Sequence, residues 1–186
     1  MSDATEVTIY IGDVYASRGA AVIKTVLGSC ISACLRDPVA RIGGMNHFML
    51  PTPCNGDAGK DLSRFGLHAM ELLIGEIQKL GGERARLQAK VFGGGHVLQM
   101  AESEDAVPQR NVRFIRQFLV TERIPLVAHD LGGRVARQVV FHTGSGSVLL
   151  KRFSGQGGMA SRMEQEHQAL VRQKKAEYGE VTLFGD

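Results

Sequence analysis

The chain has 186 residues, 44% of them hydrophobic, which is enough to bury the core of one domain. Its 22 Lys and Arg against 19 Asp and Glu give a net charge of +3, and no basic cluster with interleaved aromatic residues marks a nucleic-acid surface. Residues 1–20 lack the basic and apolar regions of a secretory signal, and no apolar stretch reaches the roughly 20 residues of a membrane span. We therefore expect a cytoplasmic protein.

Hydrophobic periodicity predicts an α+β fold in which two helices lie between groups of strands joined as hairpins. Short β-branched or aromatic runs that end at turn residues predict strands, and apolar residues spaced three or four apart predict helices. The predicted elements are, in order, strands at 7–11, 21–27, 30–35 and 42–50, a helix at 62–80, a strand at 87–92, a helix after 108, and strands at 126–129, 138–142 and 148–153. This order disfavours a doubly wound parallel sheet.

Two segments have the composition of loops or linkers. Residues 51–60 contain two Pro, two Gly, an Asn and an Asp, which predicts an exposed loop. Residues 154–158 are rich in glycine, and a charged stretch with a weak apolar stripe follows. We predict a domain at 1–153 and a charged helical tail at 154–186 that is either flexible or docked.

The three cysteines each need an explanation, because a chain without an export signal normally keeps its thiols reduced. Cys34 fits a buried core position and Cys54 a loop position. A zinc site formed by the three cysteines and His47 is disfavoured, because the sequence has no Cys-x-x-Cys pair. We predict no metal ion and no cofactor. Cys30 remains as the candidate nucleophile.

Cys30 and His47 form the candidate catalytic pair. Gly28 and Ser29 permit a tight, open turn just before the thiol. His47 lies 17 residues later on the next predicted strand, inside an apolar run where an imidazole has no packing reason to be. Antiparallel pairing of the two strands would bring the side chains together. Thr25 is the candidate for orienting the imidazole, and backbone N–H groups near residues 29 and 30 are candidates for binding an oxyanion.

Several ordered motifs resemble one family, the chemoreceptor glutamine deamidases called CheD. The resemblance spans about residues 7–153. The motifs are TVLGSC at 25–30, LRDP at 35–38, GGMNHFMLP at 43–51, VFGGG at 91–95 and TGSGSV at 143–148.

The resemblance implies an α/β sandwich similar to the catalytic domain of the cytotoxic necrotizing factor toxins. It also implies a protein-glutamine glutaminase in which a thiolate attacks the carboxamide, ammonia leaves, and water hydrolyses the thioester to glutamate. Carried over by position, the nucleophile is Cys30, the general base and acid is His47, and the orienting residue is Thr25. We predict that the substrate is contacted by the residues beside them, Gly28, Ser29, Asn46 and Phe48.

The resemblance implies methyl-accepting chemotaxis receptors as substrates and, in some bacteria, a CheC-type phosphatase as a partner. Two alternatives stay open from the sequence: a binding-only regulator of such a phosphatase, and a thiol hydrolase that acts on receptor methyl esters. The run at 93–95 lacks the lysine and Ser/Thr of a P-loop, so we interpret it as a turn that lines the active-site side. Arg110 and Asn111 are predicted to begin the second helix or to shape the substrate groove.

Overall fold

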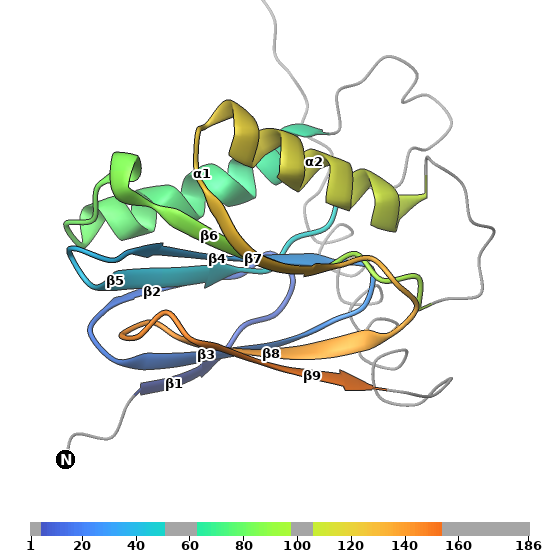
Figure 1. Ribbon diagram of the computed structural model, residues 1–186, viewed down its shortest axis with the longest axis horizontal. Coiled ribbons are helices and arrows are strands. Elements are labelled where there is room, and N and C mark those ends of the chain that lie inside the picture. The colour runs from blue at the N-terminus through green and yellow to red at the C-terminus, as the bar shows by residue number, and fades with distance from the viewer. Residues whose placement is uncertain (1–4, 51–62, 98–105, 154–186) are drawn as a thin grey trace, which may run out of the picture.

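The computed structural model describes residues 5–50, 63–97 and 106–153. Within these ranges the chain forms three layers, which are two α-helices, a five-stranded sheet and a four-stranded sheet (Figure 1). The helices cover one face of the five-stranded sheet, and the four-stranded sheet packs on its other face. The predicted α+β class is confirmed. The loop at 51–60, Cys54 and the tail at 154–186 lie outside the described residues.

The central layer is the five-stranded sheet, in which each neighbouring pair is antiparallel except the parallel pair β6 and β7. Its order is β2 (Val14–Arg18), β5 (Ile42–Asn46), β4 (Ile31–Asp37), β6 (Gln88–Gly93) and β7 (Leu126–Leu131). Because this sheet is covered on both faces, every residue of β5 and all but one residue of β4 are buried.

The outer sheet and the helices complete the layers. The four-stranded sheet has the order β1 (Thr5–Thr8), β3 (Ala21–Leu27), β8 (Ala136–His142) and β9 (Val148–Phe153), with β1 and β3 parallel. The helices are α1 (Ser63–Lys79), α2 (Val107–Thr121) and the short 3₁₀-helix η1 (Arg84–Arg86). Neither α-helix is long and apolar enough to cross a membrane.

Glycines at the centre of β5 let both covering layers approach closely. A Cβ at Gly44 would stand 2.8 Å from a side-chain carbon of Leu73 on α1, and a Cβ at Gly43 would stand 3.2 Å from the ring of Phe141 on β8. The two faces thus contact two separate apolar cores, one beneath the helices and one between the sheets. Close packing on both sides fixes the position of β5 between the helices and the four-stranded sheet, and therefore the position of the residues that follow β5.

Two strands end earlier than predicted, and one strand was not predicted. The first strand ends at Thr8, because the chain turns at residues 10–13, where Tyr10 N–H donates to the Asp13 carboxylate and Gly12 has φ +89°. That turn carries the chain from one sheet to the other and into β2, a strand that the periodicity did not predict. The strand predicted at 42–50 ends at Asn46, and beyond it only an isolated bridge joins Ile31 to Phe48.

Candidate active site

Cys30 lies where the chain crosses from the four-stranded sheet to the five-stranded sheet, between the end of β3 and the start of β4. The glycine run after β6 holds this segment in place. Gly95 N–H donates to the Gly28 carbonyl and Gly94 N–H to the Cys30 carbonyl, each at 2.8 Å. Gly93 has φ +116°, and a Cβ there would stand 2.0 Å from the Cys30 oxygen. Only glycine permits this backbone to pass so close.

His47 follows β5 directly, and its ring is held by Thr25 from the other sheet. Thr25 Oγ1 lies 2.8 Å from His47 Nδ1, and it also donates a 2.8 Å hydrogen bond to the Ile9 carbonyl. A hydroxyl has one proton to give, and the Ile9 carbonyl receives it. Thr25 Oγ1 is therefore the acceptor of the Nδ1 proton, which makes Nε2 the basic nitrogen of the neutral ring.

The two segments that carry Cys30 and His47 meet at the bridge between Ile31 and Phe48, whose backbones exchange hydrogen bonds of 2.9 and 2.8 Å. Both candidate residues immediately precede a bridge residue, so they are diagonal neighbours across an antiparallel pair. Cys30 belongs to the core between the sheets, whereas Ile31 belongs to the core beneath the helices. Cys30 is 6% exposed and His47 7%, so both are buried without being fully sealed.

Cys34 has the packing role predicted for it. It is 1% exposed and belongs to the core between the sheets. Burial raises the pKa of the Cys34 thiol well above its usual range, against smaller opposing effects of Lys90 and Ser32, so the thiol stays protonated. Over the ranges that the structure describes, no three His, Cys, Asp or Glu side chains are grouped so that they could hold a metal ion.

Asn46 and Phe48, two of the predicted substrate contacts, have their side chains in the interior. Asn46 is completely buried; its Oδ1 accepts from Ala33 N–H and its Nδ2 donates to the Ala69 carbonyl, each at 3.0 Å. Phe48 is 4% exposed and packs edge-on against Phe114 of α2, with the ring centroids 5.7 Å apart. Both side chains therefore make their contacts inside the protein. Through these contacts the two residues help to hold the backbone on either side of His47.

Comparison with known proteins identifies the family. The model of the family described as CheD chemotactic sensory transduction matches residues 49–152. The chain belongs to the CheD family. It is 41% identical over 183 residues to the probable chemoreceptor glutamine deamidase CheD 2 of Chromobacterium violaceum, an alignment that covers 97% of the chain and 90% of the relative. It is 42% identical over 185 residues to the probable chemoreceptor glutamine deamidase CheD of Thiobacillus denitrificans, covering 98% and 91%.

Two buried polar residues of this CheD-family chain contact the Cys30 segment or its supports, and the sequence reasoning did not assign them that position. Asn111 lies within α2 rather than at its start, and its Nδ2 donates to the Ser29 carbonyl at 2.8 Å. Arg137 of β8 is 2% exposed and donates to the Gly93 carbonyl at 2.6 Å. Both have a signal in the sequence, because each is a polar residue in the apolar repeat of its element.

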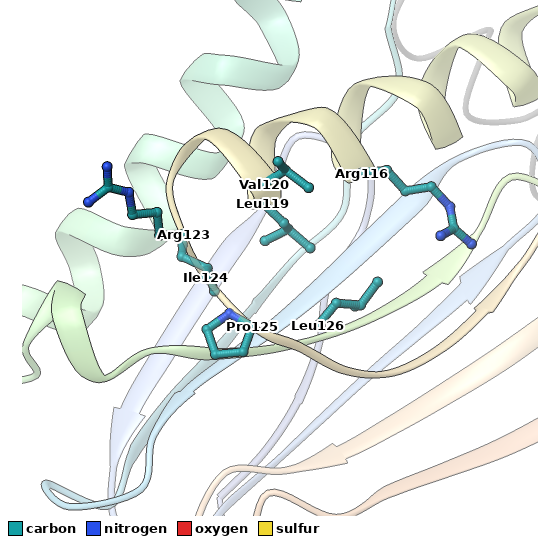
Figure 2. A pocket seen from close by; sticks show the side chains of 7 residues that line it. All are labelled: Arg116, Leu119, Val120, Arg123, Ile124, Pro125 and Leu126. Atoms are coloured by element: carbon teal, nitrogen blue, oxygen red, sulfur yellow. The ribbon is translucent and has the colours of Figure 1, made fainter.

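Among the described residues, two cavities lie along α2, one toward each of its ends. One of about 440 Å³ adjoins the Cys30 segment and is lined by Gly94, His96, Gln109, Val112, Arg113, Gly132 and Gly133. The other, of about 410 Å³, lies where α2 leads into β7 (Figure 2). There Leu119, Ile124, Pro125 and Leu126 gather between Arg116 and Arg123. Leu126 pairs with Ala89 near the start of β6, whereas the Cys30 segment is held at the end of β6. Of these two cavities, the first therefore adjoins the candidate site.

Proposed function

We propose that this protein is a cysteine-dependent hydrolase that converts glutamine side chains of methyl-accepting chemotaxis receptors to glutamate. In the proposed reaction Nε2 of His47 takes the proton of the Cys30 thiol, the resulting thiolate attacks the carboxamide carbon, and N–H groups near residues 29 and 30 bind the developing oxyanion. His47 then gives a proton to the leaving nitrogen, the C–N bond breaks, and ammonia departs to leave a thioester. His47 next takes a proton from water, which attacks the thioester, and glutamate and the thiolate are released.

The observation that carries the proposal is the hydrogen bond between Thr25 Oγ1 and His47 Nδ1. Because the Thr25 proton goes to the Ile9 carbonyl, the ring keeps a proton on Nδ1 and a lone pair on Nε2. An imidazole held in one tautomer beside a thiol is what a nucleophile and its base require. The names of the relatives, probable chemoreceptor glutamine deamidases, support the substrate assignment.

The small exposure of the pair supports a side-chain amide as the substrate. With 6% of Cys30 and 7% of His47 exposed, access to the pair is narrow. A slender group at the end of a flexible side chain, such as the glutamine carboxamide, passes through a narrow opening more readily than a main-chain amide with two flanking residues. Deamidation is therefore favoured over peptide cleavage.

The test is to incubate the purified protein with receptor cytoplasmic fragments and to measure ammonia release together with the mass gain of Gln→Glu. Wild type should give both, and Cys30→Ala should give neither. Cys34→Ala is the matched control, because it removes a buried thiol from the same strand region and should retain the activity. Equal activity of wild type and Cys30→Ala would remove that cysteine from the mechanism.

The same experiment separates the alternatives. Loss of methyl groups from methylated fragments, without ammonia, would favour a thiol hydrolase of receptor methyl esters. Absence of any modification, together with binding to a CheC-type phosphatase, would favour a binding-only regulator. The diagonal arrangement of Cys30 and His47 and the hydrogen-bonded ring support the enzyme over the regulator.

A further inference from the structure

Two asparagine side chains open the β-ladder on either side of the bridge between Ile31 and Phe48. In the antiparallel register of β4 and β5, Ala33 would exchange backbone hydrogen bonds with Asn46, and Ser29 with Leu50. At the first pair, Ala33 N–H donates instead to Asn46 Oδ1 at 3.0 Å. At the second, the amide of Asn111 stands between the two backbones.

Asn111 makes this second opening with both ends of its carboxamide. Leu50 N–H donates to Asn111 Oδ1 and Asn111 Nδ2 donates to the Ser29 carbonyl, each at 2.8 Å. One partner is a donor and the other an acceptor, which fixes the orientation of the amide. The carboxamide and its two hydrogen bonds thus take the place of a direct hydrogen bond between Leu50 N–H and the Ser29 carbonyl. The strands stay linked but are spread apart beside Cys30.

The spacer also sets the direction of the peptide that precedes the thiol. A trans peptide is planar, so its N–H points opposite to its C=O. With the Ser29 carbonyl held toward Asn111, the Cys30 N–H is directed away from Asn111. That N–H is one of the groups assigned above to the oxyanion, and Leu50, the other partner, lies three residues after His47. Asn111 therefore ties the nucleophile segment to the histidine segment.

Packing alone does not account for an amide at this position. Asn111 is completely buried in α2 and shares its face with Ile115 and Phe118, which are apolar and buried. An apolar side chain of the same size would leave Leu50 N–H and the Ser29 carbonyl without partners, and a smaller one would let them pair directly and close the opening. We propose that Asn111 is a positioning residue for the deamidation: its carboxamide keeps the Cys30 and His47 segments apart at the working separation and orients the Ser29–Cys30 peptide.

This inference rests on the proposed function, and the decisive variant is Asn111→Asp. An ionised aspartate still accepts from Leu50 N–H but has no proton to donate to the Ser29 carbonyl. We expect kcat at pH 8 to fall about 100-fold with KM little changed, a loss typical of slightly misplaced reacting groups. As the pH falls and the buried carboxyl takes a proton, it again donates to Ser29, so the ratio of variant to wild-type kcat should rise.

Ile115→Ala is the matched control, because it empties a buried position of α2 one turn further along with a side chain that cannot form a hydrogen bond. It should lower the thermal stability at least as much as Asn111→Asp while kcat stays close to wild type. Wild-type kcat for Asn111→Asp across the pH range, or an equal loss of kcat in Ile115→Ala, would overturn the inference.

A measurement without substrate separates failure of this inference from failure of the proposed function. Iodoacetamide alkylation of Cys30, followed by mass spectrometry of its peptide, should be several-fold slower in Asn111→Ala than in wild type and unchanged in Ile115→Ala. If wild type releases no ammonia but this difference is observed, the proposed activity is wrong and the positioning role stands. Equal alkylation of the two variants would refute the positioning role whatever the activity.

Discussion

Replacing Thr25 with valine tests the assignment of the imidazole tautomer. Valine has nearly the shape of threonine, and Thr25 is 2% exposed, so the change removes a hydroxyl without opening a large cavity. Both 2.8 Å contacts of Oγ1 disappear, leaving a buried Nδ1 proton and the Ile9 carbonyl without their partner. Leaving one such group unsatisfied costs about 1–3 kcal/mol.

The His47 ring avoids that cost by moving its proton from Nδ1 to Nε2. Nε2 then has no lone pair with which to take the proton of the Cys30 thiol. Since 1.36 kcal/mol corresponds to a tenfold rate change, we expect Thr25→Val to lower kcat roughly 5- to 150-fold. The Ile9 carbonyl contributes separately, so the free energy of unfolding should fall by about 1–3 kcal/mol. Ammonia release measures the first effect and urea unfolding the second.

Thr25→Ser is the control, because it keeps the hydroxyl and should keep most of the activity. Nitrogen NMR of the His47 ring adds a direct readout, with the proton on Nδ1 in wild type and in Thr25→Ser, and on Nε2 in Thr25→Val. A Thr25→Val enzyme with wild-type kcat, or a Thr25→Ser enzyme as slow as Thr25→Val, would refute the assignment.

Three further predictions concern stability and the Cys30 segment. Hydrogen bonds from Arg86 hold the pKa of the buried Asp37 carboxyl well below its usual range, so its stabilisation is complete above about pH 4 and lost as the pH falls toward the lowered pKa. Urea unfolding should show Asp37→Asn less stable by about 3 kcal/mol at pH 7, with the gap narrowing in acid. Gly93→Ala places a Cβ 2.0 Å from the Cys30 oxygen at φ +116°, so it should lose ammonia release and more than about 2 kcal/mol of stability. Gly75→Ala, inside α1 with open space around its Cβ, should instead raise the unfolding free energy by about 1 kcal/mol at unchanged activity.

Periodicity predicted the type and approximate position of most elements. The strand over 21–27 has the predicted bounds, α1 ends one residue before its predicted end, and α2 begins within two residues of its predicted start. Those elements bury a regular apolar face, which is the property that periodicity detects. The missed strand β2 has no such face, since four of its residues are only partly buried and the fifth is exposed. Its position depends on pairing with β5, a long-range contact.

The sequence was also a poor guide to where strands end near the candidate site. The run from Ile42 to Leu50 is apolar throughout, apart from Asn46 and His47, and predicts one continuous strand. The ladder between β4 and β5 ends at the pair Cys34 and Met45, because side-chain amides beyond it take up backbone groups that regular pairing would use. Such local competition between side chain and backbone is typical of asparagine, but its outcome depends on which strand lies opposite.

One kind of signal marks residues around Cys30, namely a polar residue where the periodicity requires an apolar one. His47 was recognised in this way, and the same test applied to α2 and β8 selects Asn111 and Arg137. Burying a polar group costs free energy unless it is hydrogen-bonded, so a polar residue on a buried face indicates that hydrogen-bond partners lie next to it. Here the partners converge: Asn111 binds the Ser29 carbonyl, Arg137 binds the carbonyl of Gly93, and the next residue, Gly94, holds the Cys30 carbonyl. Polar residues from different elements thus meet at one short segment. A search for polar residues at positions where the periodicity requires apolar ones selects these residues without knowledge of how the strands pair.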